Sequence, residues 1–212
     1  MPRGVAARFA YDLANPAVAD AELIARHVHD KTLHFDVYAG YRAASHLLPA
    51  TSLFTVLGDV PAERAGTRAT WKAAPRLELA ADAGVRHVAG DTAPALTARA
   101  RLALDDTNRS ALTCELRRDG ASDDAWTGVR GAARIALPYA LSASTELELV
   151  IPDDDRTAGG RFRGSAWPWA LAALGWDSGV WHAAAAVEAA ASPETRKRLD
   201  ALLSIGRTWS GP

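Results

Sequence analysis

The most regular stretch of the chain is residues 96–151, where apolar and polar residues alternate. The alternation occupies 96–104, 112–117, 129–137 and 146–151, and residues typical of turns separate these runs. Successive side chains of a β-strand point to opposite faces, so this period predicts strands with one apolar and one polar face. Connections this short exclude parallel crossovers, so we expect an antiparallel meander. We expect the apolar face to be buried, with Leu102, Cys114, Leu116, Ile135, Leu147 and Leu149 among its members.

The polar face of the same meander carries charges of both signs. We interpret these residues as cross-strand ion pairs, each worth a few tenths of a kcal/mol. They are Arg99, Arg101, Glu115, Arg117, Arg130, Arg134, Glu146 and Glu148.

Shorter runs of strand character precede the meander. They occupy 33–38, 51–57, 68–72, 76–79 and 85–88, with Gly, Pro or Asp near their ends. With the meander they bring the expectation to about eight closely spaced strands, which is typical of an antiparallel barrel or sandwich.

Three segments have helical signals. Asn15-Pro16 can cap and begin a helix, and apolar residues follow at helical spacing as far as Val28, so we expect a helix over 15–30. Residues 179–191 are rich in alanine, which favours a helix. Ser192-Pro193 is typical of the start of another helix, and Gly206 would end it. We therefore expect two C-terminal helices, over 179–191 and 192–206.

These elements predict an α+β fold. Its centre is an antiparallel β-barrel or strongly curved sheet of about eight strands, with one N-terminal and two C-terminal helices packed against it. Residues 1–151 would hold the first helix and the sheet, and residues 152–212 a Trp-rich linker and the last helices on the same domain.

Composition narrows the class of protein. The 212 residues carry a net charge of −1, which gives no electrostatic footprint for nucleic acid. Cys114 is the only cysteine, so no disulfide can form within the chain. The sequence contains neither a signal-peptide core nor a run of about 20 apolar residues. We therefore expect a cytoplasmic protein that contacts neither nucleic acid nor a membrane.

Two groups of residues are candidates for chemistry. His34, Asp36 and Tyr38 alternate along one strand, so imidazole, carboxylate and phenol share a face and could carry out acid–base catalysis. His27 and His29 end the expected helix, where a spacing of two points them apart, so we expect no metal there.

Tryptophan is concentrated near the C-terminus and suggests a binding site. Indole rings bury large apolar areas, so Trp167, Trp169, Trp176 and Trp181 could line a pocket for an apolar ligand. Gly159-Gly160 would let this segment move as a lid.

The resulting hypothesis is a small-molecule enzyme without cofactor. It would perform isomerase-, cyclase- or lyase-like acid–base chemistry on an apolar metabolite in a barrel pocket. The alternatives are a non-catalytic ligand-binding barrel, a hot-dog-type acyl-thioester hydrolase or dehydratase built around a central helix at 15–30, and a partner-binding structural module. Assembly into a homodimer stays open.

Overall fold

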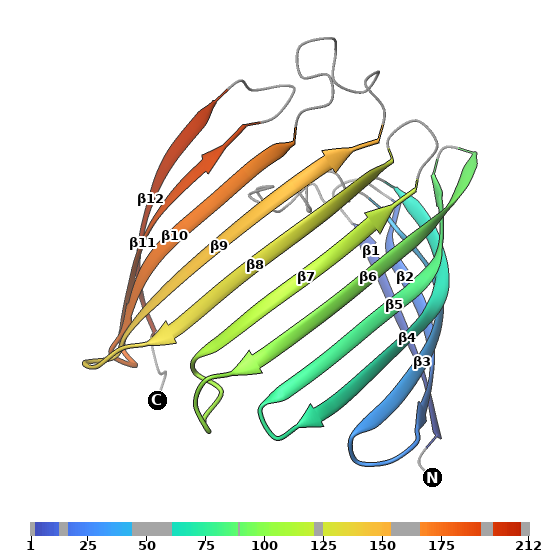
Figure 1. Cartoon of the computed structure of the whole chain (residues 1–212), viewed down its shortest axis with the longest axis horizontal. Coiled ribbons are helices and arrows are strands. Elements are labelled where there is room, and N and C mark those ends of the chain that lie inside the picture. The colour runs from blue at the N-terminus through green and yellow to red at the C-terminus, as the bar shows by residue number, and fades with distance from the viewer. Residues whose placement is uncertain are drawn as a thin grey trace.

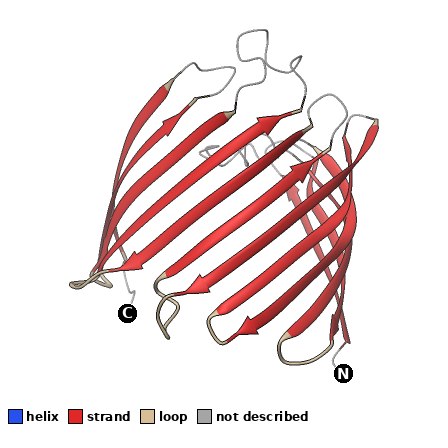
Figure 2. Ribbon diagram, viewed as in Figure 1, coloured by secondary structure: helices blue, strands red, loops and turns tan. Residues whose placement is uncertain are grey.

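The computed structural model describes residues 3–12, 17–43, 61–88, 90–120, 125–153, 166–191 and 197–208. These residues form twelve β-strands in one antiparallel sheet, whose spatial order is the order of the sequence (Figures 1 and 2). The strands are β1 (Arg3–Asp12), β2 (Ala17–Val28), β3 (Leu33–Arg42), β4 (Ala62–Ala74), β5 (Leu77–Val88), β6 (Asp91–Ala103), β7 (Ala111–Asp119), β8 (Trp126–Ala136), β9 (Leu141–Pro152), β10 (Trp167–Asp177), β11 (Trp181–Ala190) and β12 (Arg198–Arg207).

The predicted α+β class is wrong, because the structure is all-β in the part it describes. Where the expected helices at 15–30, 179–191 and 192–206 are described, they belong mainly to β2, β11 and β12, and residues 15–16 and 192–196 lie outside the described residues. Alanine has the highest intrinsic preference for a helix, and pairing with neighbouring strands overrides that preference here. No described residue belongs to a helix, so the structure contains no described helix that could cross a membrane.

The meander over 96–151 is confirmed as β6 to β9, paired in antiparallel order. Earlier in the chain, the expected short strands on either side of residues 82–84 are one continuous strand, β5. The strand expected at 51–57 and the Gly159-Gly160 hinge lie outside the described residues. Strands from both expected parts of the chain, 1–151 and 152–212, belong to the single sheet.

The two ends of the sheet differ in their connections. At one end β2–β3, β4–β5, β6–β7, β8–β9 and β10–β11 are joined by short turns, and β1 begins and β12 ends there (Figure 1). At the other end the links include 43–61 and 153–166. We call these the turn end and the loop end.

The sheet curls strongly, so that β1 and β2 lie behind the middle strands in Figure 1. Outside the bulges at Ala10–Tyr11 and Lys72–Ala74, cross-strand pairs in register assign the strand residues to one of two faces. The outer face carries Leu147 and Leu149, and the inner, concave face carries Glu146 and Glu148. All buried strand residues lie on the inner face, including Asp36, Tyr38 and Val150.

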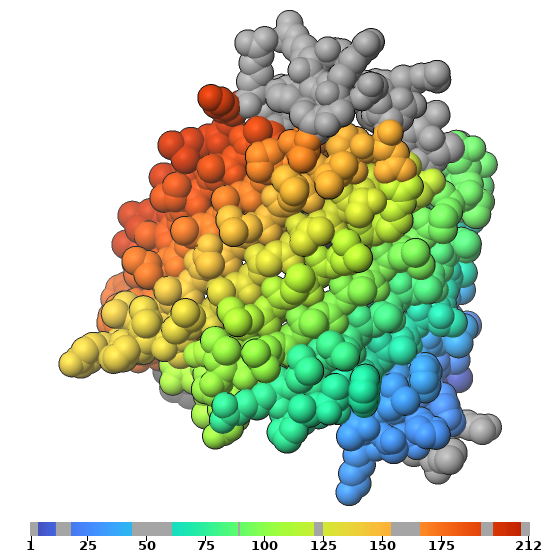
Figure 3. Space-filling model, viewed as in Figure 1, coloured from blue at the N-terminus to red at the C-terminus, as the bar shows by residue number. Residues whose placement is uncertain are grey.

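The expected buried face is the outer face, and it is exposed. The six apolar residues named above do share one face of one sheet, as predicted. The prediction of their burial is wrong, since even Leu149 is 40% exposed and Leu147 is 60% exposed. No other element lies over the strands on the face that Figure 3 shows.

Candidate functional site

Charges alternate in sign from strand to strand across the inner face. On β2 to β5 the row is Arg26, Asp36, Arg68 and Asp82, each in register with the next. Arg26 donates two hydrogen bonds to Asp36, at 2.7 and 2.8 Å, and Arg68 approaches Asp82 at 2.9 Å. Cross-strand neighbours of opposite sign stabilise each other, so the row holds four strands together from the inside.

A second row of alternating charge continues over β6 to β9. Arg99, Glu115, Arg130 and Glu148 stand in register. Arg130 pairs with Glu148 at 3.4 Å and also with Glu146 on the same strand. These contacts confirm the predicted cross-strand pairing for Arg130, Glu146 and Glu148, whereas Arg117 pairs with Glu115 on its own strand.

Tyr38, which lies on β3 beside the first row, extends across β4 to contact β5. Its ring lies over Gly66 of β4, where an added Cβ would come within 2.8 Å of the Tyr38 hydroxyl oxygen. The hydroxyl donates a 2.5 Å hydrogen bond to Asp82 on β5. Glycine is therefore required at position 66, because it allows the phenol to cross one strand and reach the next.

The structure places His34, Asp36 and Tyr38 on the same inner face of β3, as their alternation predicts. No hydrogen bond joins these three side chains to one another in the described part of the chain. Asp36 is held by Arg26, and Tyr38 is held by Asp82. Their assignment to acid–base catalysis stays a prediction.

The four tryptophans expected to line one pocket are divided between the faces. Trp167 and Trp169 are buried on the inner face with Trp126 and Val150, and Trp169 donates a 2.8 Å hydrogen bond to Glu188. Trp176 and Trp181 lie on the outer face near the turn end, 40% and 45% exposed. The structure therefore brings the four together on no single surface, and their role in ligand binding stays a prediction.

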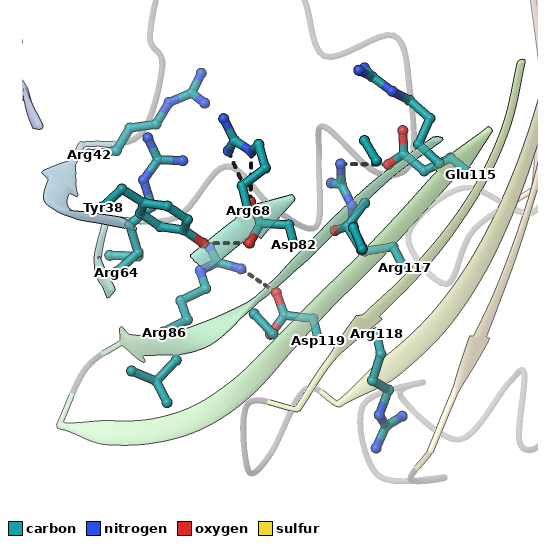
Figure 4. Close-up of a pocket in the computed structure, with 17 residues that line it drawn as sticks. Tyr38, Arg42, Arg64, Arg68, Asp82, Arg86, Glu115, Arg117, Arg118 and Asp119 are labelled. Atoms are coloured by element: carbon teal, nitrogen blue, oxygen red, sulfur yellow. Dashed lines mark hydrogen bonds and ion pairs between the residues drawn. The ribbon is translucent and has the colours of Figure 1, made fainter. Parts of the chain in front are cut away.

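A hollow of about 500 Å³, lined mainly by polar side chains, lies on the inner face of β3 to β7 (Figure 4). Tyr38 forms part of its wall together with Asp82, Glu115 and Asp119. Six inner-face arginines line it: Arg42, Arg64, Arg68, Arg86, Arg99 and Arg117. Arg118 also borders the hollow, but in Figure 4 it lies apart from the others, and it pairs with Asp153.

Sequence reasoning missed the contribution of β4 and β5 to this hollow. Arg64 and Arg68 belong to one strand, and Asp82 and Arg86 to the next, with each pair on one face. The two members of each pair are four residues apart, and this spacing could have predicted that both share one face of a strand. Alanine and glycine at the intervening positions weakened the apolar half of the alternation, so the strands were expected to be shorter.

His27 and His29 do not have the geometry on which the expectation of no metal depended. His27 lies on β2 and His29 follows it in the turn, so the helical spacing that would point them apart is absent. The described residues contain no group of three or more His, Cys, Asp or Glu side chains placed to hold a metal ion.

Comparison with models of known protein families gives no match, and no curated protein matches the chain either. Function must therefore be argued from the two faces of the sheet.

Proposed function

We propose that this sheet spans a membrane and that its inner face lines a water-filled passage, as in membrane β-barrels. The observation that carries the proposal is the inverted distribution of side chains. Apolar side chains cover the outer face, and paired charges cross the inner face from β2 to β9. A protein surrounded by water buries its apolar face, whereas a strand in a bilayer turns that face toward lipid.

The middle of the outer face carries exposed aliphatic side chains on every described strand except β4. Soluble monomers rarely expose a continuous apolar patch larger than a few hundred Å². The exposed aliphatic side chains here include Val5, Leu23, Val37, Val85, Leu96, Leu116, Val129, Leu147, Leu174, Val187 and Leu203. A hydrocarbon environment would accommodate all of them.

Exposed aromatic residues gather toward the ends of the strands. Five are at or near the turn end: Phe35, Trp71, Tyr139, Trp176 and Trp181. Phe9 and Tyr11 lie toward the other end of β1. Amphipathic rings prefer the interface between lipid and water, so bands of aromatic residues flanking an aliphatic belt fit a bilayer.

The lengths of the strands and the links between them agree with a sheet that spans a bilayer. The shortest strand, β7, has 9 residues and the longest have 13, and a tilted strand needs roughly 9–11 residues to cross a bilayer. Short turns at one end and longer links at the other are the usual arrangement of membrane sheets. In lipid the backbone groups at the edges of β1 and β12 would need partners, so the proposal requires these edges to be paired in the membrane.

The inner face needs water. Arg26 and Arg99 are ion-paired and yet about half exposed. A guanidinium carries five N–H donors, and one carboxylate can accept from only two of them in a bidentate pair. A water-filled passage would satisfy the remaining donors, which a dry core could not do.

This proposal departs from the expectation of a cytoplasmic enzyme without membrane contact. The hot-dog alternative also loses its central helix, because β2 occupies that part of the chain. Acid–base chemistry at His34, Asp36 and Tyr38 would require these residues to act from the wall of a passage, and the ion pair between Arg26 and Asp36 favours a structural role for that carboxylate.

Flotation with lipid vesicles tests the proposal. The full chain is folded in the presence of phosphatidylcholine vesicles, washed with alkaline carbonate and centrifuged through a density gradient, while circular dichroism monitors its β-structure. We expect folded protein to float with the lipid after the wash. Folded β-structure that forms in buffer without lipid or detergent and stays at the bottom of the gradient would overturn the proposal.

A further inference from the structure

We infer that the arginine-lined hollow binds a small solute carrying a dianionic oxyanion of the phosphate type. The inference rests on the proposed function for the route by which the solute arrives, since an aqueous passage would deliver it. The binding itself depends only on the side chains around the hollow.

Cationic donors outnumber the acceptors in the wall. The six inner-face arginines described above face three carboxylates, those of Asp82, Glu115 and Asp119. Two further carboxylates lie outside the lining of the hollow. Glu22 pairs with Arg64, and Glu78 approaches Arg99 at the long distance of 3.8 Å. The guanidiniums of Arg64, Arg68 and Arg99 each carry five N–H donors, more than one carboxylate can accept. An oxyanion can accept several of these hydrogen bonds at once.

Two arginines have donor groups that no described residue accepts. Arg42 makes no ion pair with any described residue, and it extends from the loop end of β3. Arg64 is held by Glu22 at 2.7 Å through Nη2, while its buried Nε has no hydrogen-bond acceptor among the described residues. A buried donor without an acceptor costs free energy, and a ligand oxygen would remove that cost.

The hollow is also fixed in shape. Arg64 and Arg68 lie against the Tyr38 ring, with guanidinium carbons 5.8 and 5.4 Å from its centroid. Tyr38 is anchored by Asp82, which also holds Arg68 (Figure 4). Side chains positioned in advance lose little conformational entropy when a ligand binds.

The inner face of β9 and β11 has the opposite character. Glu146, Glu148 and Glu188 gather on β9 and β11, outside the hollow, around Arg130 and Trp169. An anion entering the passage would thus be repelled by one wall and attracted by the other. This separation of charge places the anion over β3 to β7.

Phosphate binding to the full chain in phosphatidylcholine vesicles tests the inference. Isothermal titration with inorganic phosphate is compared with chloride at equal ionic strength, for the wild type and for Arg42→Gln, Arg64→Gln and Arg134→Gln. Arg134 is a matched control, because it faces inward from β8 and does not line the hollow. Arg42→Gln should leave folding intact, since Arg42 has no described ion pair.

We expect saturable phosphate binding that chloride does not reproduce. Each of the two variants in the hollow should weaken it by about tenfold or more, as loss of a charge-assisted hydrogen bond implies, and Arg134→Gln should leave it unchanged. Phosphate binding no different from chloride, or equal loss in all three variants, would overturn the inference.

Further arms of the experiment distinguish a lipid headgroup from a free solute as the source of the oxyanion. They also distinguish failure of this inference from failure of the proposed function. Vesicles containing phosphatidylglycerol but no free phosphate should not reproduce the stabilisation against heat that free phosphate gives. If they do, a lipid headgroup is the ligand and the inferred solute is wrong. Flotation of the same samples reports the proposed function alone: protein that floats but does not bind phosphate refutes only the inference, and protein that binds phosphate without floating refutes only the proposed function.

Discussion

Replacing Leu147 by arginine separates a lipid-facing surface from a water-facing one. Leu147 is the seventh residue of the twelve in β9, so the proposal places it near the middle of the bilayer. Its in-register neighbours are Gly131 on β8 and Ala170 on β10, which offer the new side chain no carboxylate. Arginine near the midplane on the lipid face of a membrane sheet costs about 2–4 kcal/mol. The same change on a water-exposed surface costs about 0.5 kcal/mol or less.

Leu202 supplies the matched control. It also lies mid-strand, on β12, and its exposure of 55% is close to the 60% of Leu147. Register places it on the inner face opposite Ala186, where the proposal puts water. Leu202→Arg should therefore change stability by about 0.5 kcal/mol or less.

The assay is reversible urea unfolding of both variants and the wild type in phosphatidylcholine vesicles, followed by tryptophan fluorescence. We expect Leu147→Arg to lower the free energy of unfolding by about 2–4 kcal/mol and Leu202→Arg to have little effect. Equal, small losses in the two variants would refute the argument that the two faces contact different solvents.

Three further predictions concern particular contacts. Tyr38→Phe removes the hydrogen bond to Asp82 and should cost about 1.5–3 kcal/mol in the same assay, whereas Tyr139→Phe, at a residue 89% exposed, should cost nothing measurable. Hydrogen bonds from Ser110 and Thr107 hold the pKa of Asp105 well below its usual range. At a pH above the ordinary carboxyl pKa, ionised Asp105 therefore stabilises the β6–β7 turn. This stabilisation is lost as the pH falls through the lowered pKa. Asp105→Asn should therefore lower the melting temperature at neutral pH, and a difference that does not shrink in acid would contradict this assignment. Amides of β1 and β12 should exchange with deuterium as slowly in vesicles as those of β7, and fast exchange confined to the two edges would show that they stay unpaired.

The alternation of residues was sufficient to predict the meander and which of its residues share a face, because the period of two is a local property of a strand. The same period correctly put His34, Asp36 and Tyr38 on one face. What the pattern does not contain is the solvent on each side. An apolar face reads the same whether protein or lipid covers it, so Leu147 and Leu149 were expected to be buried.

The expected helices show a second limit. In β12, Leu199 and Leu203 are four residues apart, a spacing that fits one side of a helix and one face of a strand equally well. Alanine in β11 favours a helix on its intrinsic propensity, and pairing with β10 overrides that preference. The hollow was missed for a related reason: Arg64, Arg68 and Arg86 come from two strands, and only the register of those strands brings them together.

Quenching of tryptophan fluorescence by brominated phosphatidylcholine tests the membrane proposal most directly. The chain has seven tryptophans, so single-tryptophan variants with phenylalanine at the other positions report each site separately. Trp71, Trp176 and Trp181 lie on the outer face, and Trp126, Trp167 and Trp169 are buried on the inner face. We predict strong quenching of the first three and weak quenching of the second three. Equal quenching in the two groups, or none in either, would contradict the account.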